Sequence, residues 1–256
     1  MTAPIRIVHL YPDLLSTYGD RGNVICLAQR ATWRGYDVAV DTVVRGQPIP
    51  DDPDVIFIGG GQDRCQQLAA PDLLDKAGTI ADAAQRGAVV FAVCGGYQLL
   101  GTTYRTADDE VPGLGLLDLS TQAGTDRFIG NAAVRASIGD TRGMIVGFEN
   151  HAGRTFLGPA ARPLGRVTNG RGNNGRDGTE GAVQGTIVGT YLHGPVLARN
   201  SWLADALLNL ALARRGERPM DPLDDKFERG AHAHGLRLAA RRRGRAKWAG
   251  VSRSTR

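Results

Sequence analysis

The sequence is poor in cysteine: Cys26, Cys65 and Cys94 are the only three, and they show no pairwise spacing. This scarcity argues against a disulfide framework and against a zinc site. No apolar run approaches the roughly 20 residues that would cross a bilayer. The first residues, MTAPIRIVHLYPDLL, lack the basic region and long apolar stretch of a signal peptide. We therefore expect a soluble, cytoplasmic protein.

Acidic residues are missing from the last part of the chain. From Arg229 to Arg256 there are nine Lys or Arg and no Asp or Glu, and the rest has 22 basic against 26 acidic residues, a formal charge of −4. Such a run is typical of a solvated, flexible tail, and the alternative is attraction to an anionic partner. Because no nucleic-acid-binding motif accompanies it, we expect no nucleic-acid partner. The alternative is then peripheral contact with the anionic inner face of a membrane.

Apolar runs and helical spacing alternate over the first hundred residues. Runs at 5–11, 36–43, 54–61 and 87–93 predict strands, and helical spacing over 23–34 and 72–85 predicts helices between them. Hydrophobic residues make up 42% of the 256 residues, which allows a sizeable core. The alternation predicts an α/β fold with an open, mostly parallel sheet and helices on both faces. Ligand sites in such sheets lie beyond the carboxyl ends of the strands.

The middle of the chain has a different pattern. Glycines are dense from 113 to 190 and separate short segments, with Asn-Gly turn signals that predict strands and hairpins. The segment 200–216 has the strongest helical pattern, and Gly216 and Pro219 mark its end. We therefore expect one domain over 1–216, followed over 217–256 by a linker and the flexible basic tail.

The stretch VVFAVCGGYQLLG, residues 89–101, holds the first candidate for chemistry. An apolar strand reaches Cys94, two glycines follow, and a helical pattern begins. A sharp strand-to-helix turn exposes a nucleophile at the rim of a sheet and requires small neighbours. Ala92, Gly95 and Gly96 meet that requirement, although glycine is more common at the position of Ala92. We interpret Cys94 as a nucleophile, the alternative being a buried structural thiol.

A cysteine nucleophile needs a base, and five histidines are available. His193, in GTIVGTYLHGPV, follows a predicted strand and therefore lies at the same rim as Cys94. His151, in the predicted loop FENHAGR, is the second candidate. His9 lies inside the first predicted strand, and His232 and His234 lie in the tail.

Several motifs in a fixed order resemble a known family. They are YPDLLSTYGDRGNV, GGGQDR, AVCGGYQLLG, RFIGN, VGFENHAGRT and TYLHGPVLARN. Together they resemble class I (triad-type) glutamine amidotransferases of the cobyric acid synthase-like branch. Within that branch they are most similar to the glutaminase subunits of lipid II isoglutaminyl synthases. The resemblance covers about residues 5–212 and implies a flavodoxin-like sheet.

The resemblance implies a reaction and a partner. Such a subunit hydrolyses L-glutamine to glutamate and ammonia through a cysteinyl thioester. The ammonia passes to a Mur-ligase-like synthetase, which amidates the α-carboxylate of D-glutamate in lipid II. No cofactor is implied for this subunit, while ATP and magnesium are expected in the synthetase.

The resemblance also implies roles for individual residues. Cys94 is the expected nucleophile and His193 the expected base. Substrate contacts are expected from Gln98 and from Arg127, whose planar guanidinium can bind a carboxylate through two hydrogen bonds.

An oxyanion hole is expected from two backbone segments. Backbone N–H groups of Gly59, Gly60 and Gly61, together with that of Gly95, are its expected donors.

One position departs from the family pattern. Triad-type enzymes commonly carry Glu two residues after the histidine, and Pro195 stands there. A Cys–His pair without a carboxylate lacks the group that fixes the imidazole tautomer. The pair could act alone, another carboxylate such as Glu149 could serve, or the synthetase could supply the third group. We favour the synthetase as the source of the third group.

Three other functions fit parts of the sequence. The chain could donate ammonia to another acceptor, such as a corrinoid precursor, or could be a catalytically silent regulatory module. It could also be a cysteine hydrolase or chaperone of related fold. Cys94, His193 and Arg127 together argue against a silent module, and Arg127 with Gln98 argues against the last class. The sequence contains no G-x-x-x-x-G-K-[ST] phosphate loop, so a separate synthetase is expected for either acceptor.

Overall fold

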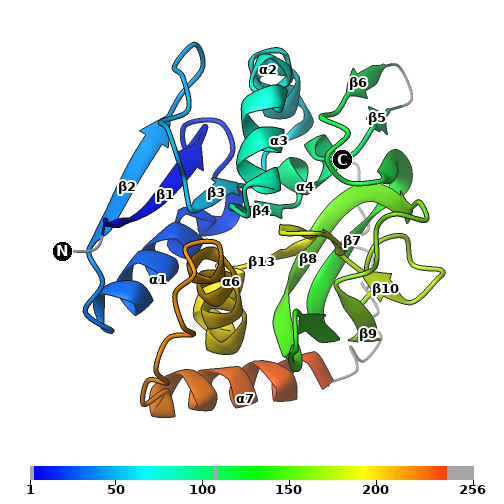
Figure 1. Cartoon of the computed structure of the whole chain (residues 1–256). Helices are drawn as coiled ribbons and strands as arrows, with labels where there is room; N and C mark the ends of the chain where they lie inside the picture. The colour runs from blue at the N-terminus through cyan, green and yellow to red at the C-terminus, as the bar shows by residue number, and fades with distance from the viewer. Residues whose placement is uncertain (1–2, 107–108, 241–256) are drawn as a thin grey trace, which may run out of the picture.

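The computed structural model describes residues 3–106 and 109–240. Figure 1 shows two adjoining β-sheets, with helices packed around the first sheet and a further helix along the base of the molecule. The remaining residues lie outside the described part, and they include 241–256 of the basic tail, for which a membrane contact is predicted.

The first sheet has six strands in the order β11-β12-β4-β3-β1-β2. Its strands are β1 (Ile5–Leu10), β2 (Val38–Val43), β3 (Val55–Ile58), β4 (Val89–Val93), β11 (Ala182–Gln184) and β12 (Ile187–Thr190). All neighbours are parallel except β11 and β12. The five parallel strands have the flavodoxin-like order. The predicted α/β class and mostly parallel sheet are therefore confirmed.

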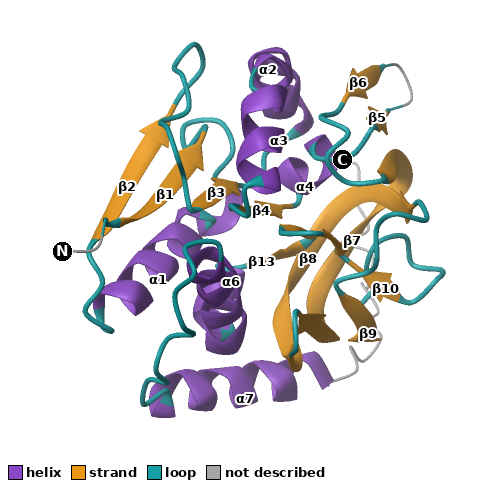
Figure 2. Cartoon of the chain, viewed as in Figure 1, coloured by secondary structure: helices purple, strands orange, loops and turns teal. Residues whose placement is uncertain are grey.

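Helices cover both faces of this sheet, as expected (Figure 2). They are α1 (Arg21–Thr32), α2 (Asp63–Asp75), α3 (Ala77–Gln85) and α6 (Ser201–Ala213). Phe57 and Phe91 pack with Leu207 of α6 in one core cluster, whereas Ile56 and Val90 join a second cluster on the other face. Strands buried on both faces are expected to be apolar throughout, which explains the VIFI and VVFAV runs of β3 and β4.

The predicted helix over 72–85 corresponds to two helices. Helix α2 begins at Asp63, and α3 continues from Ala77 after a break at Lys76. Pro71 lies inside α2 and made its beginning hard to predict from the sequence. The GGGQDR segment is therefore a short turn that leads directly into α2.

The second sheet is built on a long curved hairpin, β7 (Leu119–Ile138) and β8 (Thr141–Leu157). Its other strands are β5 (Thr103–Arg105), β6 (Glu110–Pro112), β9 (Gly165–Asn169), β10 (Thr179–Glu180) and β13 (Leu192–His193). The prediction of strands and hairpins is confirmed, but β7 and β8 are much longer than the predicted segments. The prediction took glycines as boundaries between short segments, whereas several of them lie inside these two continuous strands.

The segment 217–240 differs from the predicted linker and flexible tail. It contains α7 (Lys226–Ala240), which packs against β7 and β8. Ala239 is buried beside Ala133 and Val146, and Gly235 lies so close to Val146 that a Cβ there would be 2.9 Å from its Cγ2. The beginning of the predicted tail is therefore a helix docked on the second sheet.

A buried arginine anchors the segment before α7. Arg30 of α1 is 2% exposed and donates two hydrogen bonds to Asp205 of α6, with distances of 2.6 and 2.7 Å. It donates two more to Asp225, with distances of 2.9 and 3.0 Å. Removing one partner of a buried ion pair leaves the others uncompensated.

No described helix is long and apolar enough to span a membrane.

The Arg30 network predicts a large effect on stability. We expect Arg30→Ala to lower the free energy of unfolding by about 3–5 kcal/mol, because Asp205 and Asp225 lose their buried partner. Urea denaturation measures it. Arg105→Ala is the control, since Arg105 pairs with Glu110 on the surface and should contribute no more than about 1 kcal/mol. Equal effects of the two substitutions would contradict the assignment.

Candidate active site

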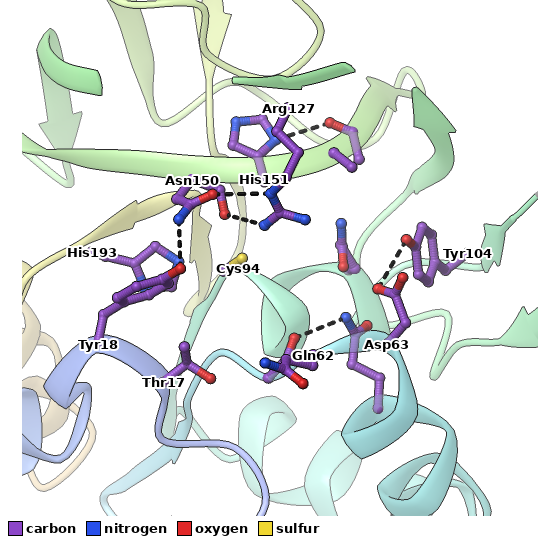
Figure 3. A pocket seen from close by; sticks show the side chains of 15 residues that line it. Thr17, Tyr18, Gln62, Asp63, Cys94, Tyr104, Arg127, Asn150, His151 and His193 are labelled. Carbon is purple, nitrogen blue, oxygen red and sulfur yellow. Dashed lines mark hydrogen bonds between the residues drawn. The ribbon is translucent and has the colours of Figure 1, made fainter. Parts of the chain in front are cut away.

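A cavity of about 290 Å³ lies between the carboxyl ends of the parallel strands and the β7–β8 hairpin (Figure 3). Its volume suits a ligand of amino-acid size. The lining residues are Thr17, Tyr18, Gly61, Gln62, Asp63, Gln66, Cys94, Gln98, Tyr104, Arg127, Asn150, His151, Ala152, Gly153 and His193. The structure thus brings together Cys94, His193, Gln98 and Arg127, which the sequence placed on four separate segments.

Cys94 lies between β4 and the short helix α4 (Gly95–Leu99), as the sequence predicts. Its backbone has φ 50° and ψ −104°, an unfavourable conformation for a residue with a side chain. The Cys94 N–H donates to Thr190 O of the neighbouring β12 at 2.8 Å, which holds the turn in place. This sharp turn presents the thiol to the cavity.

The glycines around Cys94 permit two turns to approach each other closely. A Cβ on Gly96 would lie 2.7 Å from Ile58 O and 2.8 Å from Gly59 O, at the end of β3. A Cβ on Gly95 would lie 3.0 Å from Gly61 N. Any larger side chain at Gly96 would push the β3 and β4 ends apart.

Two of the four N–H groups predicted for an oxyanion hole, those of Gly59 and Gly60, are not available to a ligand in the cavity. The Gly60 N–H donates to Asp20 Oδ2 at 2.7 Å, so this donor is already used. Gly59 does not line the cavity, and its carbonyl accepts a hydrogen bond from Gly96 N–H. The N–H groups of Gly61 and Gly95 have no acceptor among the described residues, and both lie beside Cys94.

His193 lies on β13, which pairs with β8 of the second sheet. The ring is 1% exposed, and its Nδ1 is 3.3 Å from Oδ1 of Asp20, which is fully buried. Burial alone would lower the pKa of His193, but Asp20 and Cys94 outweigh this effect and raise the pKa to about 10. The imidazole is therefore protonated at neutral pH.

Asp20 thus occupies the place of the missing carboxylate, and sequence reasoning did not find it. On the sequence alone, the synthetase is the favoured source of the third catalytic group. The structure instead places a carboxylate of this chain, that of Asp20, beside His193. Glu149, the other expected source, accepts hydrogen bonds from the N–H groups of Arg171 and Gly172 instead. The YGDRGN motif contains Asp20 and could have indicated its role, but the resemblance was assigned to the motif as a whole and not to this residue.

Arg127 lies where the register of β7 and β8 shifts, between Ala123 and Phe128. Such irregularities redirect side chains, and Figure 3 shows Arg127 directed towards the cavity. Its Nε donates to Asn150 Oδ1 and its Nη2 to Asn150 O, each at 3.0 Å. Its Nη1 has no acceptor among the described residues and can bind an anion.

Asn150 also connects Arg127 to His193 through Tyr18. Its Nδ2 donates to the Tyr18 hydroxyl, and the Tyr18 ring meets His193 edge-on with 4.9 Å between ring centroids. Neither Asn150 nor Tyr18 was predicted as a site residue. Tyr18 has a φ of 58°, so its backbone is held in an unfavourable conformation above His193.

Gln98 lies at the base of the cavity. Its Nε2 donates to the Tyr191 hydroxyl at 3.2 Å. The hydroxyl also shares a 2.6 Å hydrogen bond with Thr155, so the amide is held in one orientation. A side chain at Gly153 would overlap Gln98, which explains the glycine.

His151, the second candidate base, has a different environment. Burial lowers its pKa to about 3, so the ring is neutral. Its Nδ1 lies 2.9 Å from Gly153 O, which can only accept, so Nδ1 carries the proton. The ring stacks on Tyr191 with 3.6 Å between centroids. His193, whose ring interacts with Cys94, is therefore the better candidate for the base.

Within residues 3–106 and 109–240, no group of three or more His, Cys, Asp or Glu side chains is arranged to hold a metal ion. The cavity instead combines a thiol, an imidazolium and a guanidinium with two backbone donors. This combination can attack a carboxamide, bind the developing oxyanion and hold a carboxylate.

Comparison with known proteins gives consistent results. Residues 6–201 match the sequence model of a family described as a CobB/CobQ-like glutamine amidotransferase domain. The chain is 42% identical over 228 residues to the lipid II isoglutaminyl synthase (glutamine-hydrolyzing) subunit GatD of Staphylococcus aureus. That alignment covers 88% of this chain and 91% of the relative. The subunit of the same name from Streptococcus pneumoniae is 41% identical, with 82% of each chain covered.

Solved structures agree on the fold. The structure of PurLQS from Thermotoga maritima aligns with a TM-score of 0.59 at 16% identity, covering 84% of this chain and all of that one. A glutamine amidotransferase from the same organism aligns with a TM-score of 0.52 at 15% identity. That alignment covers 93% of this chain and 94% of the other.

Behind the cavity lies a buried carboxyl that the sequence analysis did not single out. Glu180 is 0% exposed, and its Oε1 accepts hydrogen bonds from Tyr191 N–H at 2.7 Å and from the Thr190 hydroxyl at 2.9 Å. Burial raises its pKa to about 7, although these two hydrogen bonds oppose the shift. Glu180 thereby holds the backbone that leads to His193.

Because the pKa of Glu180 is raised, we expect the free energy of unfolding to depend on pH. The folded protein retains the Glu180 proton that the unfolded chain releases near pH 4.5, so stability is lost as pH rises through about 7. We expect Glu180→Gln to reduce this loss by roughly 3 kcal/mol, measured by urea denaturation from pH 4.5 to 7.5. Glu110→Gln, an exposed carboxylate, should leave the profile unchanged. An unaltered profile in Glu180→Gln would contradict the assignment.

Proposed function

Because the chain belongs to the CobB/CobQ-like glutamine amidotransferase family, we propose that it is the glutaminase subunit of a lipid II isoglutaminyl synthase. It hydrolyses L-glutamine and delivers ammonia to a Mur-ligase-like, ATP-dependent synthetase. That partner amidates the α-carboxylate of D-glutamate in lipid II to give D-isoglutamine. The observation that carries the proposal is the placement of Cys94, His193 and Arg127 around one cavity.

The reaction begins with attack of the Cys94 thiolate on the side-chain carbonyl of glutamine. The oxyanion that forms accepts hydrogen bonds from the N–H groups of Gly61 and Gly95. His193 donates its Nε2 proton to the departing nitrogen, ammonia leaves, and a γ-glutamyl thioester remains on Cys94. A water then gives a proton to His193 and attacks the thioester, which releases glutamate.

Arg127 and Gln98 select the substrate. The free Nη1 of Arg127 binds the α-carboxylate of glutamine, since Arg127 and Cys94 line the same cavity. The amide of Gln98, which the Tyr191 hydroxyl holds in place, contacts the bound molecule. A charged hydrogen bond of this kind contributes about 1.5–3 kcal/mol to binding.

The synthetase supplies what this chain lacks. ATP and magnesium bind to the partner, and this subunit needs no cofactor of its own. The reaction takes place in the cytoplasm, where the stem peptide of lipid II faces the synthetase. The basic run from Arg229 to Arg256 would then provide peripheral contact with the anionic inner face of the membrane.

A corrinoid precursor is the less favoured acceptor. A probable cobyric acid synthase of Methanothermobacter thermautotrophicus is 34% identical over 75% of this chain, but the alignment covers only 39% of that protein. The two GatD subunits, in contrast, align over most of their length.

Co-expression with the synthetase tests the proposal. We expect Cys94→Ser to abolish glutamine-dependent amidation of lipid II by the complex, because no thioester can form. Amidation supported by ammonium chloride should persist, because the synthetase is intact. Mass spectrometry of the lipid II stem peptide measures both.

Cys26→Ser and Cys65→Ser are the matched controls. Burial raises the pKa of Cys26 to about 12, so it is an unreactive thiol. Both variants should retain glutamine-dependent amidation. Loss of the ammonium-supported reaction in Cys94→Ser, or retention of the glutamine-dependent one, would contradict the proposed function.

A further inference from the structure

We propose that Asp20 is the third member of a Cys94–His193–Asp20 triad, a positioning residue that fixes the His193 ring for proton transfer. This inference rests on the proposed function, because it concerns the base of the same site. It assigns to this chain a role that the family pattern gives to a glutamate two residues after the histidine. Here the carboxylate comes from the residue before α1, 173 positions earlier in the chain.

The hydrogen bonds of Asp20 define its role. Oδ1 lies 3.3 Å from His193 Nδ1, and Oδ2 accepts the Gly60 N–H at 2.7 Å. A carboxylate can only accept, so the proton of this pair lies on Nδ1. Nε2 is then the ring nitrogen left for the Cys94 thiol, and it has no other partner among the described residues.

The fold delivers Asp20 to His193 through a row of contacts. Gly22, two residues after Asp20, lies against Pro195, and a Cβ on Gly22 would overlap the proline ring. Asn23 Oδ1 accepts the Leu197 N–H at 2.9 Å. The beginning of α1 therefore runs beside residues 193–197, and Pro195 packs against α1 where the family places its carboxylate.

Charge balance supports the same assignment. Asp20 is 0% exposed, and a buried carboxylate requires a compensating charge. The pKa of nearby His9 is lowered to about 4, first by burial and then by Arg21, so His9 is neutral. The His193 imidazolium is therefore the buried group that balances Asp20.

Other groups around His193 do not replace Asp20. His151, from β8, is neutral, and Tyr18 meets the ring through its edge. Glu149 accepts hydrogen bonds from the N–H groups of Arg171 and Gly172 and forms no hydrogen bond with His193. Asp20 is thus the carboxylate that holds the ring, and it also fixes the glycine turn through Gly60.

Thiol alkylation tests the triad without requiring glutamine or the synthetase. The rate of Cys94 modification by iodoacetamide is measured from pH 5 to 10 on the full chain, with Cys94→Ser as the background for Cys26 and Cys65. In Asp20→Asn, the amide donates to Nδ1 and selects the wrong tautomer. We expect the rate at pH 6.5 to fall at least about tenfold and the inflection to move up by at least about one pH unit.

Asp13→Asn removes an exposed carboxylate seven residues earlier and should leave the profile unchanged. An Asp20→Asn profile that matches the unsubstituted protein would overturn the proposal. Because no glutamine is used, a protein without glutaminase activity could still show the triad, so the two proposals fail separately.

A second measurement does not depend on a folded variant. Nitrogen-15 NMR of His193 in the unsubstituted protein reports which ring nitrogen carries the proton. The triad predicts a protonated Nδ1 throughout pH 6–9. An unprotonated Nδ1 in that range would overturn it.

Discussion

The close approach of the turns after β3 and β4 is the constraint on which the site depends. Gly96 lies so near Ile58 and Gly59 that no side chain fits between the two turns. The same approach brings Gly61 close to Gly95, so that a Cβ on Gly95 would lie 3.0 Å from Gly61 N. Cys94, between the two turns, has an unfavourable backbone conformation, and its N–H donates to Thr190 O of the neighbouring strand β12. Cys94 and the two backbone N–H groups proposed as oxyanion donors therefore depend on the same pair of closely packed turns.

The second half of the site comes from the chain as it crosses between sheets. Thr190 ends β12 of the first sheet, and His193 already belongs to β13 of the second. The crossing carries His193 into the gap above Cys94, and the β7–β8 hairpin brings Arg127 to the opposite wall. Asp20 then closes the arrangement from α1. The cavity exists only where both sheets meet, so neither sheet alone could provide it.

Features encoded in consecutive residues could be predicted from the sequence. The apolar run before Cys94 and the two glycines after it predict the strand, the turn and the short helix. The position of His193 after a strand predicts its place at the rim. Asp20 could not be predicted in this way, because its contact with His193 joins segments 173 residues apart and depends on how α1 packs. The prediction that the Gly60 N–H is a free donor was wrong for the same reason, because this N–H donates to Asp20.

Helix α7 illustrates a second limit. Its glycines and charges indicate a linker when they are considered locally. The structure shows that Gly235 permits close contact with Val146, so a residue that weakens an isolated helix helps this one to dock. The long hairpin was divided into short predicted strands for a related reason, because glycines inside its two continuous strands were taken as boundaries.

The most direct test of the account is a crystal structure of the protein after reaction with a diazoketone analogue of glutamine. The account predicts a covalent bond to Cys94 Sγ and a ketone oxygen within hydrogen-bonding distance of the Gly61 and Gly95 N–H groups. It also predicts that the α-carboxylate lies on Arg127. An adduct on Cys26 or Cys65, or a carboxylate directed away from Arg127, would contradict it.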